Sequence, residues 1–544
     1  MTLFERILTA RGLTTRAACE AFLQPDYMAV KHDPFLLPDM KKAVARLKQA
    51  REQGEKIVIY GDYDIDGLSA TALLLDAFGK FGFEDVDAFI PNRFVEGYGM
   101  TMGAVDKVRD MGADLIVTVD TGSLCHAEIA YAASLGIDTV VTDHHNVAET
   151  PPPSVAAVNP KFPGHTYPFR DLCGAGVAFK LVQALQTELD GLPDGYEKWL
   201  LDLVALGTVC DIVTLADENR ANVYWGLEVL KKQQRPGLKA LMAVAGIEPE
   251  QVNARHLGFG LGPRMNAAGR LETAQHALDM LVARDGLAAL EASEKLEELN
   301  GKRRGIQDAI FEEACQQAEE LADNRVLVVS SDGWNHGVIG IVASKLVEKY
   351  KKPVFIIGER GEEATGSARS FGDFSAADAV RAADDIIIKG GGHGAAAGVT
   401  LETEKIGDFR RRVNEFYDSL QLTNQERYLL PRADVEIGDF SEITEELIEN
   451  LAKMEPFGNG NPEPVVKITT AIVLSVRRMG ADGQHVKLAL RDKNGKVLQM
   501  LVFNAPEEFF REPGDEVAAW FQPTVNEWQG VRTIEGRLLN IQLL

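Results

Sequence analysis

Cysteine is scarce in this chain of 544 residues, which contains only Cys19, Cys125, Cys173, Cys210 and Cys315. No two of them are spaced as a Cys-x-x-Cys pair. An odd, sparse count is typical of a protein with reduced thiols and argues against a disulfide framework. Long hydrophobic runs are also missing, because no stretch approaches the roughly 18 apolar residues that a membrane span requires. The first residues mix an acid and a base, so we expect no signal peptide and a cytoplasmic location.

Motifs of two common enzyme classes are absent as well. The chain has no Gly-x-x-x-x-Gly-Lys-Ser/Thr loop, which argues against an NTP-driven motor. It has no Gly-x-Ser-x-Gly turn, which argues against an α/β-hydrolase nucleophile. The chemistry of this chain must therefore rest on other groups.

Positive charge is in short supply, since 57 Lys and Arg residues stand against 81 Asp and Glu, a formal net charge of −24. Taken alone, this balance argues against a general nucleic-acid binder and against binding to anionic membranes. One stretch departs from it. Between Val465 and Met500 there are seven basic and two acidic residues, a local excess of positive charge that suits a DNA backbone.

What the chain does contain is an alternation of short apolar runs and helical stretches from Lys56 onward. Apolar runs that end in acidic loops predict a parallel sheet with helices on both faces. The ligands of such sheets lie at the carboxyl ends of the strands. The predicted strands are Ile57–Tyr60, Val86–Ile90, Leu115–Val119 and Thr139–Thr142. Breaks are expected in the proline-rich segment that begins at Pro151 and around Gly258–Gly269.

We interpret the chain as an α/β multidomain protein. Residues 1–50 form an N-terminal helical arm, 51–273 the first α/β domain, 274–324 a long charged connecting helix and 325–425 a smaller α/β domain. Residues 426–544 are β-rich and predict a small closed barrel, an OB-fold. The barrel strands are expected at Val465–Val476, Val486–Arg491, Val497–Phe503, Val517–Thr524 and Thr533–Gln542. Its aromatic residues Phe503, Trp520 and Trp528 are expected in the barrel core, with stacking on DNA bases as the alternative.

Three carboxylates, those of Asp62, Asp64 and Asp66, follow the first predicted strand. Asp residues at alternating positions can bring several carboxylates to one point at a strand end. An EF-hand calcium loop also begins in this way, but it needs a Glu at its twelfth position, where this chain has Leu73. A solvated acidic turn is the remaining structural alternative.

The same placement recurs at two further predicted strand ends, which carry Asp120 and the run Asp143, His144 and His145. Carboxylates and imidazoles together suit Mn²⁺, Mg²⁺ or Zn²⁺, and the oxygen-rich mixture favours Mn²⁺ or Mg²⁺. Asp211 is a further candidate, because an Asp within an apolar stretch is costly to bury without a partner. It either caps a helix or reaches a metal.

Five or six carboxylates at one point would repel each other, and two divalent ions would neutralise much of that charge. Two ions ~3.5–4 Å apart stabilise the attacking and leaving oxygens of phosphoryl transfer and lower the pKa of a bound water towards ~7. We therefore predict metal-assisted hydrolysis of a phosphoester.

Downstream segments supply groups that can bind phosphate. Arg264, Asn266 and Arg270 lie in a predicted Gly-rich turn, from which guanidinium groups can grip an anion. In the smaller α/β domain, Ser367, Arg369 and Ser370 offer hydroxyl and guanidinium donors, and Gly390–Gly394 offers backbone N–H groups. Surface Arg residues and a flexible glycine turn are the structural alternatives.

These motifs, in this order, resemble the DHH phosphoesterases. The four metal motifs of that family match the segments that begin at Asp62, Asp120 and Asp143 and the segment Gly-Thr-Val-Cys that ends at Asp211. The segments around Trp334, Gly366 and Gly391 resemble the DHH-associated domain. The stretches Leu-Gly-Pro-Arg-Met-Asn-Ala-Ala-Gly-Arg and Met-Glu-Pro-Phe-Gly-Asn-Gly-Asn-Pro-Glu-Pro resemble segments specific to the RecJ family.

The resemblance implies a single-strand-specific DNA exonuclease that runs 5′→3′, releases mononucleotides and acts in repair and recombination. It implies that the protein works with single-strand-binding protein and a repair helicase, and we expect a monomer. It implies two Mn²⁺ or Mg²⁺ ions at Asp64, Asp66, Asp120, His144 and Asp211. Asp62 and His145 either bind an ion or orient a residue that does. DNA would be bound by Arg264, Asn266, Arg270, Ser367, Arg369, Ser370, Gly391, Gly392 and His393.

The chain departs from the family pattern at two places. After Asp120 it has Thr121, where relatives commonly have Cys or Asn, and His336 is displaced by one residue relative to the family's Trp-His-x-Gly. We assign no role to His336. Two alternatives remain: a DHH phosphodiesterase of cyclic dinucleotides or short oligonucleotides, which would lack the barrel, and a non-catalytic single-strand-binding replication factor, which would lack the metal ligands.

Overall fold

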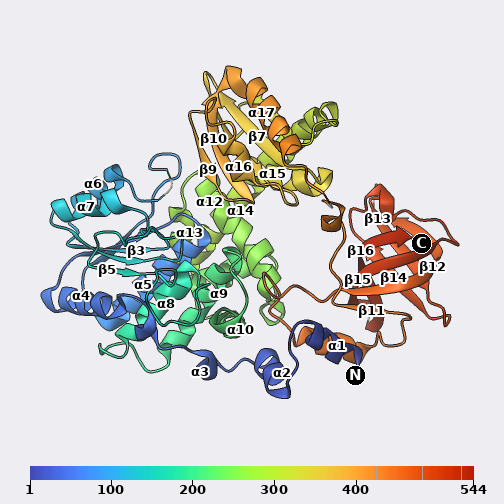
Figure 1. Cartoon of the computed structure of the whole chain (residues 1–544). Coiled ribbons are helices and arrows are strands. Elements are labelled where there is room, and N and C mark those ends of the chain that lie inside the picture. The colour runs from blue at the N-terminus through green and yellow to red at the C-terminus, as the bar shows by residue number, and fades with distance from the viewer. Residues whose placement is uncertain (98, 424, 481, 529) are drawn as a thin grey trace. The chain divides into compact units, whose positions relative to one another are not determined.

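The computed structural model contains three β-sheets, formed by successive stretches of the chain (Figure 1). It describes every residue except Tyr98, Asn424, Ala481 and Gln529, and it leaves out the side chain of Trp528. The chain divides into two compact units. One combines Met1–Asn266, Ala274–Glu294 and Pro431–Leu544; the other combines Ala267–Thr273 and Lys295–Leu430.

The N-terminal arm is helical, as predicted, but its first helix belongs to the core of the C-terminal barrel. Thr2 and Glu5 form a capping box that starts this helix. Leu3 and Ile7, four residues apart and therefore on one face, are buried in the same hydrophobic cluster as the barrel strands. The arm consists of α1 (Leu3–Ala10), α2 (Arg16–Leu23), α3 (Tyr27–Val30), the 3₁₀ turn Pro34–Leu36 and α4 (Met40–Gln53).

The first sheet is parallel and has the order β2-β1-β3-β4-β5. The four predicted strands are confirmed as β1 (Ile57–Gly61), β2 (Val86–Phe89), β3 (Leu115–Val119) and β4 (Asp138–Thr142). Sequence analysis missed β5 (Ala156–Val158), which lies in the segment predicted as a loop. Helices α6 (Met102–Asp110) and α7 (His126–Ser134) cover one face, and α5 (Ile65–Phe81) and α8 (Gly174–Leu185) cover the other (Figure 1).

Helices follow the sheet up to the long connecting segment. They are α9 (Leu201–Cys210), α10 (Asp217–Lys231), α11 (Pro236–Val244), a π-helical turn at His256–Leu261, α12 (Gly262–Leu271) and α13 (Gln275–Val282). The break predicted around Gly258–Gly269 is therefore wrong. Proline is tolerated in the first turn of a helix, which is where Pro263 lies in α12.

The connecting helix α14 runs from Gly286 to Glu320. It is shorter than the predicted segment 274–324, because residues 283–285 separate it from α13. Its 35 residues correspond to ~50 Å of helix. The helix begins in one compact unit and ends in the other.

The second sheet is mixed and has the order β6-β7-β8-β10-β9. The predicted α/β character of this region is confirmed, since it begins with β6 (Leu327–Asp332), α15 (His336–Tyr350) and β7 (Val354–Arg360). Strands β8 (Glu363–Arg369), β9 (Lys389–Gly392) and β10 (Ala396–Glu402) complete the sheet, with helices α16 (Ala376–Arg381) and α17 (Ile406–Ser419). The glycine run Gly390–Gly394, for which a flexible turn was the structural alternative, is thus partly strand β9.

The C-terminal sheet closes into a barrel, because β12 pairs with both β13 and β15. The five predicted strands are confirmed as β12 (Val466–Met479), β13 (His485–Arg491), β14 (Val497–Val502), β15 (Glu516–Trp528) and β16 (Val531–Leu543); β11 (Val435–Ile437) and α18 (Glu445–Ala452) precede them. Trp520 is buried, but in a small cluster with Val465 and Ala518 that is separate from the barrel core, so its predicted place in that core is wrong. Phe503 is 63% exposed because it follows the end of β14, so its predicted place in the core is wrong. The prediction for Trp528 concerns a side chain outside the described residues.

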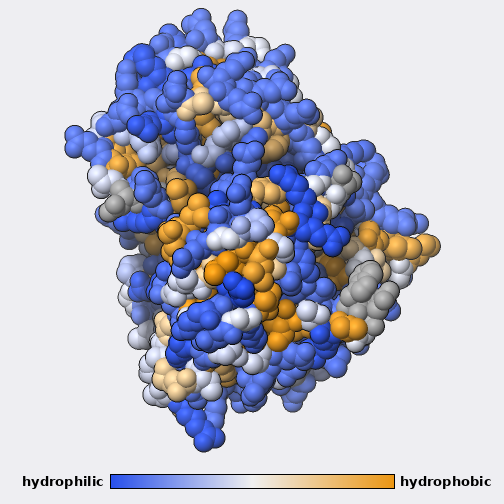
Figure 2. All heavy atoms as spheres, turned by 90° about the vertical axis from the view of Figure 1, so that its right-hand side faces the viewer, coloured by the Kyte–Doolittle hydropathy of each residue, from blue (hydrophilic) through white to orange (hydrophobic). Residues whose placement is uncertain are grey.

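The face of the molecule drawn in Figure 2 is largely hydrophilic, with hydrophobic residues gathered in a few patches. Among the described helices, none combines the length and the apolar composition needed to cross a membrane. This agrees with the lack of long apolar runs in the sequence.

Candidate metal centre and substrate-binding residues

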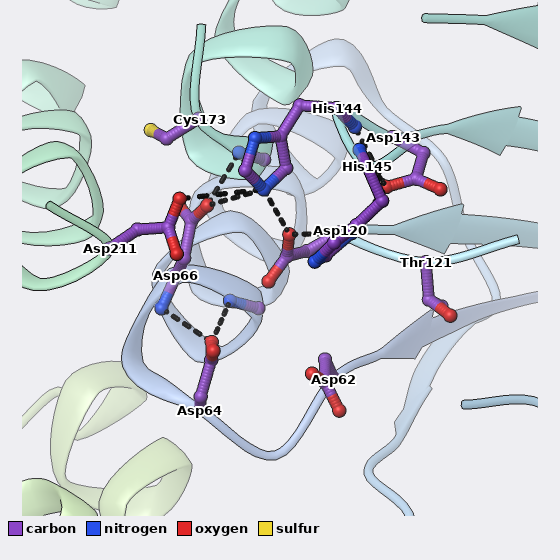
Figure 3. A network of polar contacts seen from close by, with 12 residues as sticks. Asp62, Asp64, Asp66, Asp120, Thr121, Asp143, His144, His145, Cys173 and Asp211 are labelled. Atoms are coloured by element: carbon purple, nitrogen blue, oxygen red, sulfur yellow. Dashed lines mark hydrogen bonds and ion pairs between the residues drawn. The ribbon is translucent and has the colours of Figure 1, made fainter. Parts of the chain in front are cut away.

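The register of the first sheet brings three acidic strand ends together. Gly61 of β1 pairs with Val119 of β3, which in turn pairs with Thr142 of β4. The residues that follow these three positions are Asp62, Asp120 and Asp143, and all three are buried. Figure 3 shows their side chains at one edge of the sheet, as the position of ligands in parallel sheets predicts.

Two further carboxylates lie at helix N-termini beside this edge. Asp64 caps α5, and its Oδ1 accepts hydrogen bonds from the backbone N–H groups of Asp66 and Gly67. The Asp66 carboxylate accepts from the N–H groups of Gly174 and Ala175, at distances of 2.5 and 2.8 Å. These donors begin α8, whose N-terminus favours a negative charge. Sequence analysis missed this role of the α8 N-terminus.

Glycine at position 174 makes the approach of α8 possible. A Cβ atom there would lie 2.5 Å from the Cβ of Asp120, closer than two such atoms can come. Asp120 itself has a φ of 60°, in the left-handed region that Asp adopts more readily than most residues. The α8 N-terminus and the Asp120 turn are therefore packed directly against each other.

His144 points its Nε2 atom into the space between three carboxylates (Figure 3). That atom lies 3.0 Å from Asp120 Oδ1, 3.5 Å from Asp211 Oδ2 and 3.7 Å from Asp66 Oδ2. Burial lowers the pKa of His144 to about 3, which keeps the ring neutral at neutral pH. A neutral imidazole is the form of His that binds metal ions.

Two of these buried atoms have no hydrogen-bond partner in the described part of the chain. They are Nε2 of His144 and Oδ1 of Asp120, which face each other. Buried polar atoms are normally satisfied, so an unpaired nitrogen facing an unpaired carboxylate oxygen calls for a bound group. A divalent cation fits, because both atoms are metal-ligand types.

The electrostatics of the carboxylates support the same conclusion. Burial, followed by repulsion from neighbouring Asp residues, raises the pKa of Asp62 to about 7, of Asp66 to about 6 and of Asp211 to about 8. The same causes raise the pKa of Asp120 well above its ordinary value. Carboxylates that resist ionisation together are stabilised as anions when a cation lies among them.

His145 has a different environment from His144. Its Nδ1 lies 2.9 Å from Asp143 Oδ1, which also accepts from the backbone N–H groups of His144 and His145. Although burial disfavours the charged form, the hydrogen bond to Asp143 raises the pKa of His145 to about 9. The same bond holds the pKa of Asp143 well below its usual range. Asp143, which sequence analysis placed among the acidic strand ends without a separate task, therefore anchors both histidines.

The ligand atoms form three overlapping groups, each compact enough to hold a metal ion. They are Asp66, His144 and Asp211; Asp62, Asp64 and Asp120; and Asp120, His144 and His145. All seven of these residues were predicted from the sequence as metal-binding or catalytic. The overlap at Asp120 and His144 suits two neighbouring ions.

Asp211 reaches the centre from the end of α9, where it is the C-cap residue. The interpretation of Asp211 as a helix cap is confirmed, and its Oδ2 lies 3.5 Å from His144 Nε2, where a metal ligand would have to lie. A cavity of about 660 Å³ lies beside this end of α9. Its lining includes Cys210, Ile212, Phe259, Asn266, Asn459 and Arg537.

The expected phosphate-binding residues Arg264, Asn266 and Arg270 lie on helix α12 and not in a turn, which corrects the prediction. Arg264 donates to the carbonyl oxygen of Gly260, and Arg270 donates to that of Gly337 at the start of α15. All three side chains are partly exposed. The boundary between the two compact units falls within α12, after Asn266.

Ser367 and Arg369 are two residues apart on β8 and therefore share a face. Arg369 donates to Ser367 Oγ at 3.1 Å, and its burial lowers its pKa, although a guanidinium stays charged. The pair lies against α15, because a Cβ at Gly340 would be 3.1 Å from Ser367 Oγ. Ser370 uses its hydroxyl within its own loop, where it donates to the carbonyl oxygen of Phe374.

Gly391, Gly392 and His393 form the exposed end of the β9–β10 hairpin. The backbone N–H of His393 donates to the carbonyl oxygen of Ala396 at 2.8 Å. Gly392 has a φ of 147°, and a Cβ there would clash with that carbonyl oxygen. Glycine at this position thus makes the tight hairpin turn possible.

The basic stretch of the barrel is partly neutralised by acids outside it. Lys467 pairs with Glu436, and Lys487 pairs with Glu535, each at 2.7 Å. The other basic residues of the stretch are exposed and form no such ion pair with the described residues; they are Arg477, Arg478, Arg491, Lys493 and Lys496. Lys496 donates to backbone carbonyl oxygens of Phe440 and Ile443.

Three segments of the chain match known domain families. Residues 56–208 match the DHH family N-terminal domain, residues 323–419 the DHHA1 domain and residues 433–539 the RecJ OB domain. The single-stranded-DNA-specific exonuclease RecJ of Bacillus subtilis is 40% identical over 96% of this chain and 65% of its own length. The enzyme of the same name from Escherichia coli is 34% identical over 93% of this chain and 90% of its own length.

Solved structures agree with these relationships. RecJ of Thermus thermophilus in complex with Mn²⁺ has a TM-score of 0.82 and 30% identity, and covers 99% of this chain and 75% of its own. The same protein in complex with Mg²⁺ has a TM-score of 0.75 and 27% identity over 99% of this chain and 74% of its own. This chain, which spans 65% of the length of its Bacillus subtilis relative, belongs to the RecJ family of DHH proteins.

Proposed function

We propose that this chain is an exonuclease that degrades single-stranded DNA from the 5′ end to mononucleotides, by metal-dependent hydrolysis of the terminal phosphodiester. One observation carries the proposal. A neutral His144 faces the carboxylates of Asp66, Asp120 and Asp211 in a chain that also contains the DHHA1 and RecJ OB domains. Membership of the RecJ family supports the substrate, and the polarity rests on the family alone.

Two Mn²⁺ or Mg²⁺ ions are the proposed cofactors. Asp64, Asp66, Asp120, His144 and Asp211 would hold them, and Asp62 completes one of the three ligand groups. Bound there, the ions would neutralise the carboxylates, lower the pKa of a bound water and stabilise charge on the phosphate oxygens. The relatives crystallised with Mn²⁺ and with Mg²⁺ support the choice of metal.

The protein's own residues then have separate tasks. Asp143 would orient His145 through the ring Nδ1, and this partly exposed ring lies beside Asp120, where a phosphodiester would approach. Arg264, Asn266, Arg270, Ser367, Arg369, Gly391, Gly392 and His393 would bind DNA phosphates, and Ser370 would support the loop that follows Arg369. Exposed Arg477 and Arg478 would contact the DNA backbone at the barrel.

The wider role follows from the family. We propose a monomer that acts in the cytoplasm, in DNA repair and recombination, together with single-strand-binding protein and a repair helicase. The division into an arm (1–50), a DHH domain (51–273), a connecting helix (274–324), a DHHA1 domain (325–425) and an OB domain (426–544) is part of the same proposal.

The two alternatives are less well supported. A small-substrate DHH phosphodiesterase does not need the barrel, which occupies the last fifth of this chain. A non-catalytic single-strand-binding factor does not need metal ligands, yet Asp66, Asp120, His144 and Asp211 are all present and converge.

The proposal is tested by digestion of single-stranded oligonucleotides labelled at the 5′ or the 3′ end, with Mn²⁺, Mg²⁺ or EDTA. We expect labelled mononucleotide to appear first from the 5′ end, only with metal, and no digestion of a blunt duplex of the same sequence. Mononucleotide released first from the 3′ end would contradict the polarity. Cleavage of a cyclic dinucleotide in preference to the oligonucleotide would favour the first alternative.

A further inference from the structure

The backbone turns sharply directly after Asp211. Ile212 has a φ of 59°, in the left-handed region that β-branched residues rarely adopt. Its side chain is 69% exposed, so burial of that side chain does not offset the strain. Contacts from other parts of the chain are therefore needed to hold this turn, and through it the end of α9.

The contacts come from a loop that precedes the barrel strands, almost 250 positions later in the sequence. The side-chain Nδ2 of Asn459 donates to the carbonyl oxygen of Ile212 at 2.8 Å. The backbone carbonyl of Asn459 accepts from the N–H of Leu215, also at 2.8 Å. One residue thus holds both ends of the segment 212–215, with its side chain at one end and its main chain at the other.

Glycines on either side of Asn459 let the two backbones approach. A Cβ at Gly458 would lie 2.7 Å from a side-chain carbon of Leu215. A Cβ at Gly460, whose φ is 76°, would lie 2.6 Å from a side-chain carbon of Thr214. Any larger residue at these two positions would push the loop away from the turn.

The loop is itself fixed in place. The buried Asn461 side chain donates to the carbonyl oxygens of Met454 and Pro456, both at 2.9 Å. Arg220 of α10 donates to the carbonyl oxygens of Met454, Glu455 and Pro456. Because the loop is bonded at several points, Asn459 is presented to the turn by a preorganised support and not by a mobile segment.

We propose that Asn459 is a positioning residue for Asp211: it holds the strained turn that follows Asp211 and so keeps the Asp211 carboxylate directed at His144 Nε2. The inference rests on the proposed function, in which Asp211 holds a metal ion. Asn459 lies in the segment that sequence analysis assigned to the barrel domain, but its proposed task is in the first α/β domain. Removal of the Asn459 side chain would let Ile212 return to an ordinary φ and turn the end of α9.

The test measures Mn²⁺ binding to the full chain without DNA, by calorimetry or by electron paramagnetic resonance of the free ion. We expect Asn459→Ala to weaken Mn²⁺ binding ~10-fold, the lower end of the effect of residues that support metal ligands. Asn459→Asp, which has the same shape but cannot donate, should lose at least as much. Asn526→Ala, an exposed Asn on β15, is the matched control and should bind Mn²⁺ as the parent does.

Two further readouts separate positioning from a general structural role. Excess Mn²⁺ should restore the kcat of Asn459→Ala, while the KM for single-stranded DNA stays at the parent value. Adding Ile212→Asn should recover Mn²⁺ affinity in the Asn459→Ala background, because Asn adopts a positive φ more readily than Ile.

Unchanged Mn²⁺ affinity in Asn459→Ala, or a change confined to the KM for DNA, would overturn the inference and leave the proposed function intact. Failure of Ile212→Asn to recover any affinity would also overturn it, since the effect would then not act through the turn. A parent chain that binds no Mn²⁺ would overturn the proposed metal centre and this inference together.

Discussion

His144 Nε2 lies 3.0 Å from Asp120 Oδ1, and neither atom has a hydrogen-bond partner among the described residues. The two residues follow neighbouring strands of one parallel sheet, so the sheet register brings them together. A neutral imidazole nitrogen and a buried carboxylate oxygen in this relationship are unsatisfied without a cation between them. This pair is the core of the proposed metal centre.

Asp120 belongs to the ligand group of Asp62 and Asp64, and its Oδ1 lies 3.0 Å from His144 Nε2 of the other group, so its loss should affect both ions. We predict that Asp120→Asn weakens Mn²⁺ binding by at least ~100-fold and reduces mononucleotide release by a similar factor. Titration calorimetry and release of labelled nucleotide measure the two effects. Asp110→Asn, an exposed Asp on α6, is the control. Parent-like activity of Asp120→Asn would remove Asp120 from the centre.

The stability of the metal-free chain should fall as the pH rises from 6.5 to 8.5. The folded-state pKa values of Asp62 and Asp211, about 7 and about 8, lie above the ordinary value of 3.8. The folded chain therefore binds more protons than the unfolded chain in this range, and their stabilisation is lost as the pH rises through these values. The raised pKa of His145 acts in the same direction.

Denaturant unfolding in EDTA should give a free energy of unfolding lower by ~3 kcal/mol at pH 8.5 than at pH 6.5. Asp211→Asn should reduce this difference, because one of the titrating groups is gone. Mn²⁺, which binds the ionised carboxylates, should stabilise the chain more at pH 8.5 than at pH 6.5. A metal-free chain that gains stability over this range would contradict the proposed repulsion among the carboxylates.

Arg369 is proposed to bind a DNA phosphate from β8. Arg369→Ala should weaken binding of single-stranded DNA and reduce the slope of log affinity against log salt concentration by about 1, because one phosphate contact is lost. Arg369→Lys keeps the charge and should keep most of the slope. Fluorescence anisotropy at several KCl concentrations measures both. An unchanged slope in Arg369→Ala would place Arg369 away from the DNA.

A buried ion pair joins the N-terminal arm to the first α/β domain. Lys180 of α8 donates to Glu218 of α10 at 2.7 Å and to the carbonyl oxygen of His32 in the arm at 2.6 Å. Glu218 also accepts from the Tyr167 hydroxyl. Both charged side chains are almost fully buried.

Glu218→Gln should lower the free energy of unfolding by ~3–5 kcal/mol, because it leaves a buried charge uncompensated. Glu228→Gln on the same helix breaks an exposed pair with Lys231 and should cost less than ~1 kcal/mol. Denaturant titration compares the two variants. Equal effects would mean that the Lys180 ammonium finds another partner.

Much of the proposed metal centre could be predicted from local sequence patterns. Asp62, Asp120 and His144 could be predicted because each follows an apolar run that becomes a strand of one parallel sheet, and strand ends of such a sheet converge. Asp211 stood out as an acid in an apolar stretch. Tertiary packing could not be predicted, because no local sequence pattern indicates that Gly174 must approach Asp120 or that the α8 N-terminus binds Asp66.

The predictions failed where the structure depends on a long-range contact, or where residues such as glycine and proline are compatible with both a turn and a helix. Gly262–Leu271 forms a helix despite its glycines, with Pro263 in the first turn, where proline is tolerated. Helix α1 packs into a barrel core formed by residues more than 400 positions later. The bond from Asn459 to Ile212 likewise joins segments whose proximity only the tertiary fold determines.

The most direct test of the metal centre is a crystal structure of the chain with Mn²⁺, with anomalous diffraction used to locate the ions. We predict two anomalous peaks, one among Asp66, His144 and Asp211 and the other among Asp62, Asp64 and Asp120. Loss of both peaks in Asp120→Asn would strengthen the assignment. Mn²⁺ located only at sites away from these residues, with none beside His144 Nε2, would contradict it.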